Sequence, residues 1–350
     1  MLNHYYIFRL CQRFIQFIQT PRLPGYRQPF NRQRRFLLLM LATTLVASAC
    51  GSNTAQTNNQ SETSASKTMK RVKHALGETE VPVNPTKIVV MDLLTVEAVM
   101  SLGVQPIAAS KMVIDNLLHL PTANPEIADI GHPRNPNIEK IVALKPDLIL
   151  TSKIVTEPET YTLLSNIAPT VVFDIDSDAQ WQKLTPLCAE VLGKQAEAEK
   201  LLKDYEAKLQ KLKTQLSNNQ RQIKVSVVLS FNAKLIRAVG KDTFSGSVLE
   251  AAGISRPANQ AEGKGTQVSP ELLSEIDGDA LFFLKPQSQT KIADDVRKAV
   301  EKIKQNPLWS KLKVVQTNQV HEVDAYWYGV GYIAANLILD DLFKYLVKEP

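Results

Sequence analysis

Hydrophobic residues after the first seventy positions gather in short runs, and segments with helical spacing lie between them. The β-branched run at 87–91 (KIVVM) predicts a strand, and 95–102 (TVEAVMSL) predicts a helix that ends at Gly103. A further strand is predicted at 104–109. Strand, helix and strand in so short a stretch indicate an α/β unit.

This succession recurs along the chain. A helix at 138–144 ends at Lys145-Pro146, and buried strands are predicted at 147–151 and 170–175. A second series of the same kind follows, with strands predicted at 224–231, 280–284 and 313–316 and a helix at 247–252. The pattern therefore predicts two α/β lobes.

One strongly amphipathic segment, 194–217, lies between the two series. Its apolar positions recur every three or four residues: Ala198, Leu201, Leu202, Tyr205, Leu209, Leu212 and Leu216. As a helix it would be about 36 Å long. A dimerising coiled coil is one interpretation, and a strut packed inside one molecule is the favoured one. We therefore expect an N-terminal lobe at 72–178, a linker helical region at 179–217 and a C-terminal lobe at 218–350.

A weak internal repeat supports the two-lobe prediction. Glu139 and Glu271 each begin a predicted helix, with Asp147 and Asp279 eight residues later and a buried strand immediately after each aspartate. An acid in the first helical turn is stabilised by the helix dipole, and this alone would explain each glutamate. It does not explain why both lobes present the same arrangement, which a symmetric partner would recognise.

The N-terminal segment has the order of a secretory signal. Arginines at 32, 34 and 35 precede an apolar run at 36–49 that ends in small residues before Cys50. The run would span only about 21 Å as a helix, short of a ~30 Å hydrocarbon core. We predict a signal peptide at 1–49 and a lipidated Cys50; simple cleavage before Cys50 is the alternative. The polar stretch 50–71 then predicts a flexible tether.

The charge distribution changes the meaning of the formal net charge of +6. Residues 1–49 hold seven arginines and no lysine or acid, which leaves 34 basic and 35 acidic residues, net −1, in the rest of the chain. A nucleic-acid-binding protein would carry its excess positive charge in the folded part, so that class is excluded. Cys11, Cys50 and Cys188 form no CxxC pair, which excludes a disulfide scaffold.

Several motifs resemble the helical-backbone class of substrate-binding lipoproteins that serve ABC importers of ferric siderophores, haem and cobalamin. They are Gly131-His-Pro-Arg-Asn-Pro-Asn-Ile-Glu139, Lys145-Pro-Asp-Leu-Ile-Leu150, Val268-Ser-Pro-Glu271, Asn306-Pro-Leu-Trp309 and Gly331-Tyr-Ile-Ala-Ala-Asn336. The resemblance implies two Rossmann-like lobes joined by one long helix, with the ligand cleft between them and little movement of the lobes. It also implies that Glu139 and Glu271 dock onto arginines of an ABC permease dimer.

The form of the first motif resembles binders of iron-loaded hydroxamate or carboxylate siderophores more than the cobalamin branch. A ferric siderophore presents ionised oxygens, so its site needs fixed cations. Arg134 and Arg237 are the first candidates for ligand contact, and Lys111 is a weaker one. A solvated surface arginine is the alternative interpretation of each.

Three aromatic residues are candidates for a wall of the site. They lie in a predicted loop before the last helix, with Trp327 as the favoured wall and Tyr326 and Tyr328 behind it. Packing in the core is the alternative for these residues.

Two other kinds of site are set aside. Gly329-Val-Gly-Tyr-Ile-Ala334 matches a dinucleotide fingerprint literally, but no clear strand precedes it and no strand carrying an acid follows. Direct metal binding would need clustered ligands, whereas the histidines after residue 50, at 74, 119, 132 and 321, are widely separated.

We therefore expect a non-catalytic, monomeric, lipid-anchored receptor on the outer side of the cytoplasmic membrane. It would have no resident cofactor, bind a ferric siderophore and deliver it to the permease. One alternative keeps this role with haem or cobalamin as cargo. The other is an exported α/β enzyme acting on a small anionic substrate.

Overall fold

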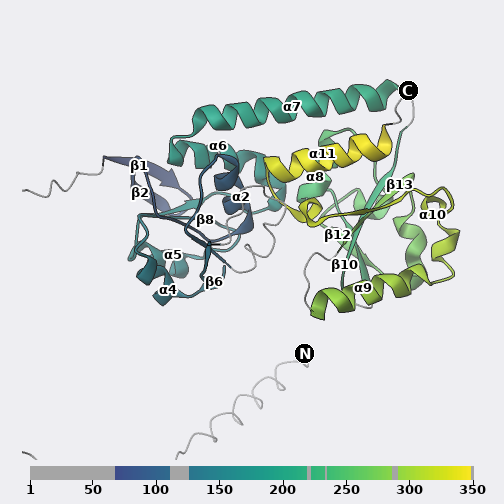
Figure 1. The fold of residues 1–350 in the computed structure, drawn as a ribbon, viewed down its shortest axis with the longest axis horizontal. Helices are drawn as coiled ribbons and strands as arrows, with labels where there is room; N and C mark the ends of the chain where they lie inside the picture. Colours follow the sequence, from purple (N-terminus) through teal and green to yellow (C-terminus); the bar gives the residue numbers. More distant parts are fainter. Residues whose placement is uncertain (1–67, 111–125, 219–221, 233–234, 286–290, 348–350) are drawn as a thin grey trace, which may run out of the picture. The chain divides into compact units, whose positions relative to one another are not determined.

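The computed structural model describes residues 68–110, 126–218, 222–232, 235–285 and 291–347 (Figure 1). All of them belong to one unit, Ser64–Pro350. The predicted signal peptide, Cys50, the tether as far as residue 67, and Lys111 lie outside the described residues.

The N-terminal lobe is built on a five-stranded parallel sheet in the order β5-β4-β3-β8-β9. The sheet strands are β3 (Ile88–Val90), β4 (Ala108–Ala109), β5 (Ala128–Asp129), β8 (Leu148–Ser152) and β9 (Thr170–Phe173). In the described part of this lobe, strands are followed by the helices α2 (Leu93–Ser101), α4 (Ile138–Leu144) and α5 (Pro158–Ser165). Two antiparallel hairpins, β1 (Met69–His74) with β2 (Gly77–Pro82) and β6 (Gly131–His132) with β7 (Asn135–Pro136), complete it.

The C-terminal lobe has a mixed five-stranded sheet in the order β12-β11-β10-β13-β14. Its strands are β10 (Val225–Asn232), β11 (Leu235–Val239), β12 (Gly265–Val268), β13 (Ala280–Leu284) and β14 (Val320–Val323). The pairs β10-β13 and β13-β14 are parallel, whereas β10-β11 and β11-β12 are antiparallel. Its helices are α8 (Phe244–Ala251), α9 (Lys291–Lys304), α10 (Lys313–Gln316) and α11 (Tyr332–Leu346), with 3₁₀ turns η3 (Ala258–Gln260), η4 (Pro270–Ile276), η5 (Trp309–Lys311) and η6 (Ala325–Tyr328).

Helices connect the two lobes. The connection runs through η2 (Asp178–Gln180), α6 (Trp181–Leu192) and the long α7 (Gln195–Asn218). Gly193, with a φ of +68°, ends α6 in the left-handed region that favours glycine. The 24 residues of α7 pack against α6 and against α11 of the C-terminal lobe (Figure 1). The predicted strut is therefore an intramolecular helix that contacts both α6 and the C-terminal lobe.

The strands alternate between two separate cores because successive side chains of a strand point to opposite faces of its sheet. In β3, Ile88 and Val90 join one cluster of buried residues, and Val89 joins another. In β13, Phe282 and Phe283 divide in the same way between two clusters. Both sheets are thus covered on both faces, as an α/β fold requires.

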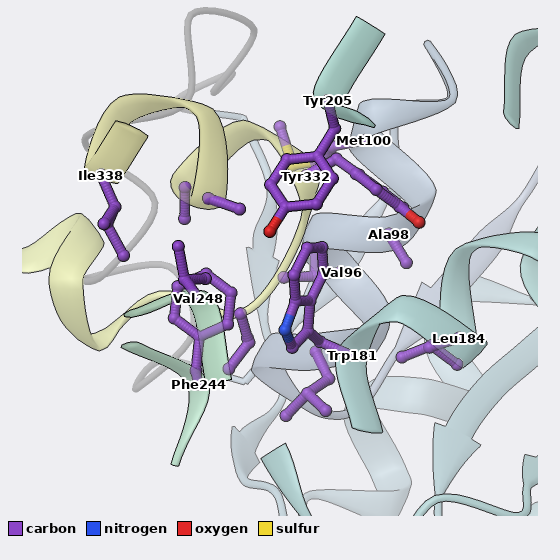
Figure 2. Close-up of a cluster of buried hydrophobic side chains, with 14 of the residues drawn as sticks. Val96, Ala98, Met100, Trp181, Leu184, Tyr205, Phe244, Val248, Tyr332 and Ile338 are labelled. Carbon is purple, nitrogen blue, oxygen red and sulfur yellow. The ribbon is translucent and has the colours of Figure 1, made fainter. Parts of the chain in front are cut away.

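One of these clusters continues from lobe to lobe and is called the shared core here. Figure 2 shows its centre, where Trp181 of α6 lies among Tyr205 of α7, Phe244 of α8 and Tyr332 of α11. The ring centroid of Trp181 lies 5.4, 5.4 and 4.9 Å from those three rings, at angles typical of edge-to-face packing. The indole N–H of Trp181 also donates to Ser247 Oγ of α8 at 3.0 Å. Hydrophobic packing therefore fixes one lobe against the other.

The repeat seen in the sequence has a structural counterpart in each lobe. Asp147, just before β8, accepts the backbone N–H of Lys87 at 2.9 Å, and Asp279, just before β13, accepts that of Lys224 at 2.9 Å. Each aspartate thereby fixes the start of the neighbouring parallel strand, β3 in one lobe and β10 in the other. In both lobes, an aspartate thus accepts a backbone N–H at an equivalent place in the sheet.

Two expectations differ from the structure. The segment 313–316 forms helix α10 rather than a strand, because Asp277 accepts the backbone N–H groups of Lys313 (2.8 Å) and Val314 (3.1 Å) and caps the turn. The fifth strand of that sheet is β14 instead. The first hairpin begins at Met69, three residues before the expected start at Val72, because β1 pairs with β2 from Met69 onward.

Cys188 lies on α6 with an exposed fraction of 0% and forms no disulfide. Burial raises the pKa of this thiol well above its usual value, with a smaller contribution from Asp92. The thiolate, which is the reactive form, is therefore disfavoured.

Candidate functional site

A cavity of about 310 Å³ lies between the lobes, at the edge where strands of both sheets end. On the N-terminal side it is lined by residues that follow β3, β8 and β9, at the carboxyl ends of these parallel strands. On the other side it is lined by parts of β10, β11 and α8 and by the loop after β14. Ligands of open α/β sheets bind at this edge, so the cavity is the candidate site.

Aromatic residues of the loop after β14 form part of the cavity wall. Tyr328 and Trp327 both line the cavity, but Tyr328 is 55% exposed and Trp327 only 1%. The Trp327 ring stacks on Phe282 at a centroid distance of 4.5 Å, and its N–H donates to Asp341 Oδ2 at 2.8 Å. Tyr326, whose hydroxyl donates to the same oxygen at 2.6 Å, does not line the cavity. In this wall Tyr328 is the accessible aromatic side chain and Trp327 is buried against Phe282, and the contact of either residue with the ligand stays a prediction.

The two arginines singled out from the sequence lie in different surroundings. Arg237 of β11 lines the cavity, where one of its Nη atoms donates to the backbone carbonyl of Lys264 at 3.2 Å, and Lys264 lines the cavity as well. Arg134 is exposed in the β6–β7 hairpin and is not among the lining residues; its backbone N–H donates to His132 Nδ1 at 3.2 Å. Arg134 therefore does not line this cavity among the described residues, and its contact with the ligand stays a prediction.

Sequence analysis missed three charged residues of the cavity. Asp176 and Asp178 line its N-terminal side, and Lys264 lines the opposite side. Asp178 Oδ2 also accepts the backbone N–H of Phe244 at 3.3 Å, across the boundary between the lobes. The sequence could have predicted the two aspartates as site residues, because they come directly after a buried strand that ends at the sheet edge.

A buried carboxylate supports the wall from beneath. Glu97 of α2, which is 0% exposed, accepts the backbone N–H groups of Val330 and Ala334, each at 3.0 Å. These groups belong to the N-terminal end of α11, where the helix dipole favours negative charge. Val330 also lines the cavity, so Glu97 joins the N-terminal lobe to the part of the C-terminal lobe that forms the wall.

The same contact explains the glycine motif that resembles a dinucleotide fingerprint. A Cβ atom on Gly331 would lie 3.0 Å from both Cγ and Oε1 of Glu97, closer than side chains normally approach. On Gly329 it would lie 2.7 Å from the Cβ of Ala334. The glycines leave room for a carboxylate of the chain itself, and that carboxylate occupies the anion-binding end of the helix.

The two predicted docking glutamates are exposed at helix starts in separate lobes. Glu139 is in the first turn of α4, which is capped by Asn137 accepting the Lys140 N–H at 2.9 Å. Glu271 is in the first turn of η4. Hydrogen bonds from Ser269 and from its own backbone N–H lower the pKa of Glu271, which keeps it ionised at neutral pH.

Metal-binding clusters and membrane-spanning helices were also sought in the part of the chain that the structure describes. No three His, Cys, Asp or Glu side chains there are grouped so that they could hold a metal ion. None of the helices described there has the length and apolar character needed to cross a bilayer.

Comparison with known proteins gives a consistent result. The profile of the periplasmic binding protein family matches residues 88–326. The probable siderophore-binding lipoprotein YfiY of Bacillus subtilis is 32% identical over 325 residues, which cover 89% of this chain and 97% of that protein. The Fe(3+)-citrate-binding protein YfmC of B. subtilis is 28% identical over 299 residues, covering 84% and 90%. The crystal structure of Staphylococcus aureus SirA complexed with staphyloferrin B superposes with a TM-score of 0.66 at 28% identity, covering 79% of this chain and 98% of SirA.

Proposed function

Because this chain belongs to the periplasmic binding protein family, we propose that it captures a ferric siderophore outside the cytoplasmic membrane and delivers it to an ABC permease. The observation that carries the proposal is the cavity between the lobes, with Tyr328 on its wall and Arg237 and Lys264 beside it. Oxygen atoms bound to ferric iron keep negative charge, and they accept charge-assisted hydrogen bonds from a guanidinium or ammonium group. YfiY, which is similar over most of its length, is named a probable siderophore-binding lipoprotein.

The protein acts as a receptor rather than a catalyst in this proposal. It is exported, held at the membrane by a lipid on Cys50, and works as a monomer without a resident cofactor. The proposed tether at 50–71 would join the lipid to the N-terminal lobe, the linker helical region and the C-terminal lobe, so that the cavity can reach the permease. Glu139 and Glu271, one exposed on each lobe, are the proposed contacts with permease arginines.

Tryptophan fluorescence tests the proposed cargo. Of the three tryptophans, Trp327 lines the cavity and Trp309 belongs to a cluster on the far face of the C-terminal sheet. Ferric siderophores should quench the emission at submicromolar concentration. Replacing Trp327→Phe should remove much of the quenching, because the ring keeps its stacking partner while the reporter is lost; Trp309→Phe is the matched control. Quenching by haem or cobalamin, with no response to any ferric chelate, would contradict the proposed cargo.

Arg237 is the proposed cationic contact with the ligand. Replacing Arg237→Ala should weaken binding by about 1.5 to 3 kcal/mol, the usual contribution of a hydrogen bond to a charged group. Arg237→Lys should recover only part of this loss, because it keeps the charge but not the planar fork. Isothermal titration calorimetry measures both effects, with Arg71→Ala, exposed on β1 and outside the cavity, as the control. Equal losses at Arg237 and Arg71 would show that Arg237 is not a specific contact with the ligand.

A further inference from the structure

Four charged side chains line the cavity within the described parts of the chain, and they are arranged by sign. The acids Asp176 and Asp178 belong to the N-terminal side, just after β9. The cations Arg237 and Lys264 belong to the C-terminal lobe, on β11 and just before β12. A ligand in the cavity therefore meets negative charge on one side and positive charge on the other.

These four groups form no ion pairs within the described chain. Arg237 donates only to a backbone carbonyl, and Asp178 accepts only a backbone N–H. Neighbouring charges outside the cavity behave differently: Lys153 pairs with Asp174 at 2.9 Å, and Lys285 pairs with Asp324 at 3.1 Å. In the described parts of the chain, the cavity thus holds charges of both signs that form no ion pair, so a ligand can pair with them.

The accessible aromatic side chain lies close to both signs of charge. Partial burial and the carboxylate of Asp178 raise the pKa of Tyr328, and Arg237 opposes this shift. Its hydroxyl group is therefore close to an acid of one lobe and a cation of the other. The wall, the acids and the cations therefore line one and the same cavity.

The balance of charges discriminates between classes of ferric chelate. Among the described lining residues, two acids against two cations give a formal charge of zero. Three hydroxamates, each singly charged, neutralise ferric iron, whereas three doubly charged catecholates leave a strongly anionic complex. An anionic chelate would be attracted to Arg237 and Lys264 but would also meet Asp176 and Asp178, and like charges at close range are costly.

Resting on the proposed function, we infer that the cavity selects ferric chelates that are uncharged at the iron and carry a cationic arm. The arm lies at Asp176 and Asp178, and the iron-bound oxygens face Arg237 and Lys264. A ferric hydroxamate with a terminal amine has this distribution of charge.

Two ligands that differ in one charge test the inference. Ferrioxamine B carries a terminal ammonium group, and its N-acetyl derivative does not. The full-length protein should bind ferrioxamine B about tenfold to a hundredfold more tightly, the range expected when a charged hydrogen bond is made or lost. Equal affinity for the two ligands, or tighter binding of ferric dicitrate or a ferric tris-catecholate, would overturn the inference and leave the proposed function intact.

Variants of the two acids test whether Asp176 and Asp178 cause the preference for the cationic ligand. Asp176→Asn and Asp178→Asn keep side-chain size and an acceptor oxygen, so the fold and the contact with the Phe244 N–H are retained. Each should reduce the preference for ferrioxamine B over its acetylated form. Asp174→Asn in the same segment is the matched control, because Asp174 pairs with Lys153 and does not line the cavity. A preference unaffected by the first two changes would also overturn the inference, whereas failure of every ferric chelate to bind would refute the proposed function itself.

Discussion

Iron uptake should be abolished by the double change Glu139→Arg and Glu271→Arg, while the affinity for ligand stays the same. Both glutamates are exposed, one on each lobe, and neither lines the cavity. Reversing both charges would place arginine opposite the permease arginines proposed as their partners, and like charges suppress association. The measurements are uptake of labelled ferric siderophore by cells and titration of the purified protein.

A matched control is available in the same fold. Glu159 of α5 and Asp294 of α9 are also exposed acids in the first turn of a helix. The double change Glu159→Arg and Asp294→Arg loses the same helix-dipole stabilisation, about 0.3 to 1 kcal/mol for each residue, and should leave uptake unchanged. If the first double variant loses ligand affinity, or if both double variants lose uptake alike, Glu139 and Glu271 are not docking residues.

Replacing Glu97→Ala should lower the free energy of unfolding by about 3 kcal/mol. The change removes the acceptor of two buried backbone N–H groups, and each unsatisfied donor costs about 1 to 3 kcal/mol. Glu97→Gln, which keeps one oxygen as an acceptor, should lose less. Urea denaturation followed by circular dichroism measures the loss.

Glu199→Ala serves as the control, because this glutamate is exposed on α7. The free energy of unfolding of this variant should differ from that of the wild-type protein by no more than about 0.5 kcal/mol. A loss at Glu97 no larger than at Glu199 would contradict its role in joining the lobes. Because Val330 lines the cavity, the Glu97→Ala variant should also bind ligand less tightly under conditions where it remains folded.

Much of the fold could be predicted because the strands are continuous apolar runs. The run at 280–284 forms β13 with those bounds, and 147–151 differs from β8 by one residue at each end. The run at 313–316 has similar residues but forms a helix, because its cap comes from Asp277, more than thirty residues earlier. Local patterns do not contain such a distant contact.

The candidate site was harder to predict because its residues converge only in three dimensions. Trp327 and Tyr328 are neighbours in the sequence, yet one is buried and the other exposed, and hydrophobicity does not separate them. Glu97 has the pattern of an exposed residue in a helix, and its partners lie more than two hundred residues further along the chain. The glutamate repeat was found because its two copies can be compared within one sequence.

The shared core also determines how the protein loses its structure. The interior face of each lobe is completed by side chains of the other lobe and of the connecting helices, so a fragment containing one lobe would expose much of that apolar surface to water. We therefore expect the two lobes, although separate in architecture, to unfold together. A ligand bound between them stabilises the whole described fold, since neither lobe can unfold without releasing it.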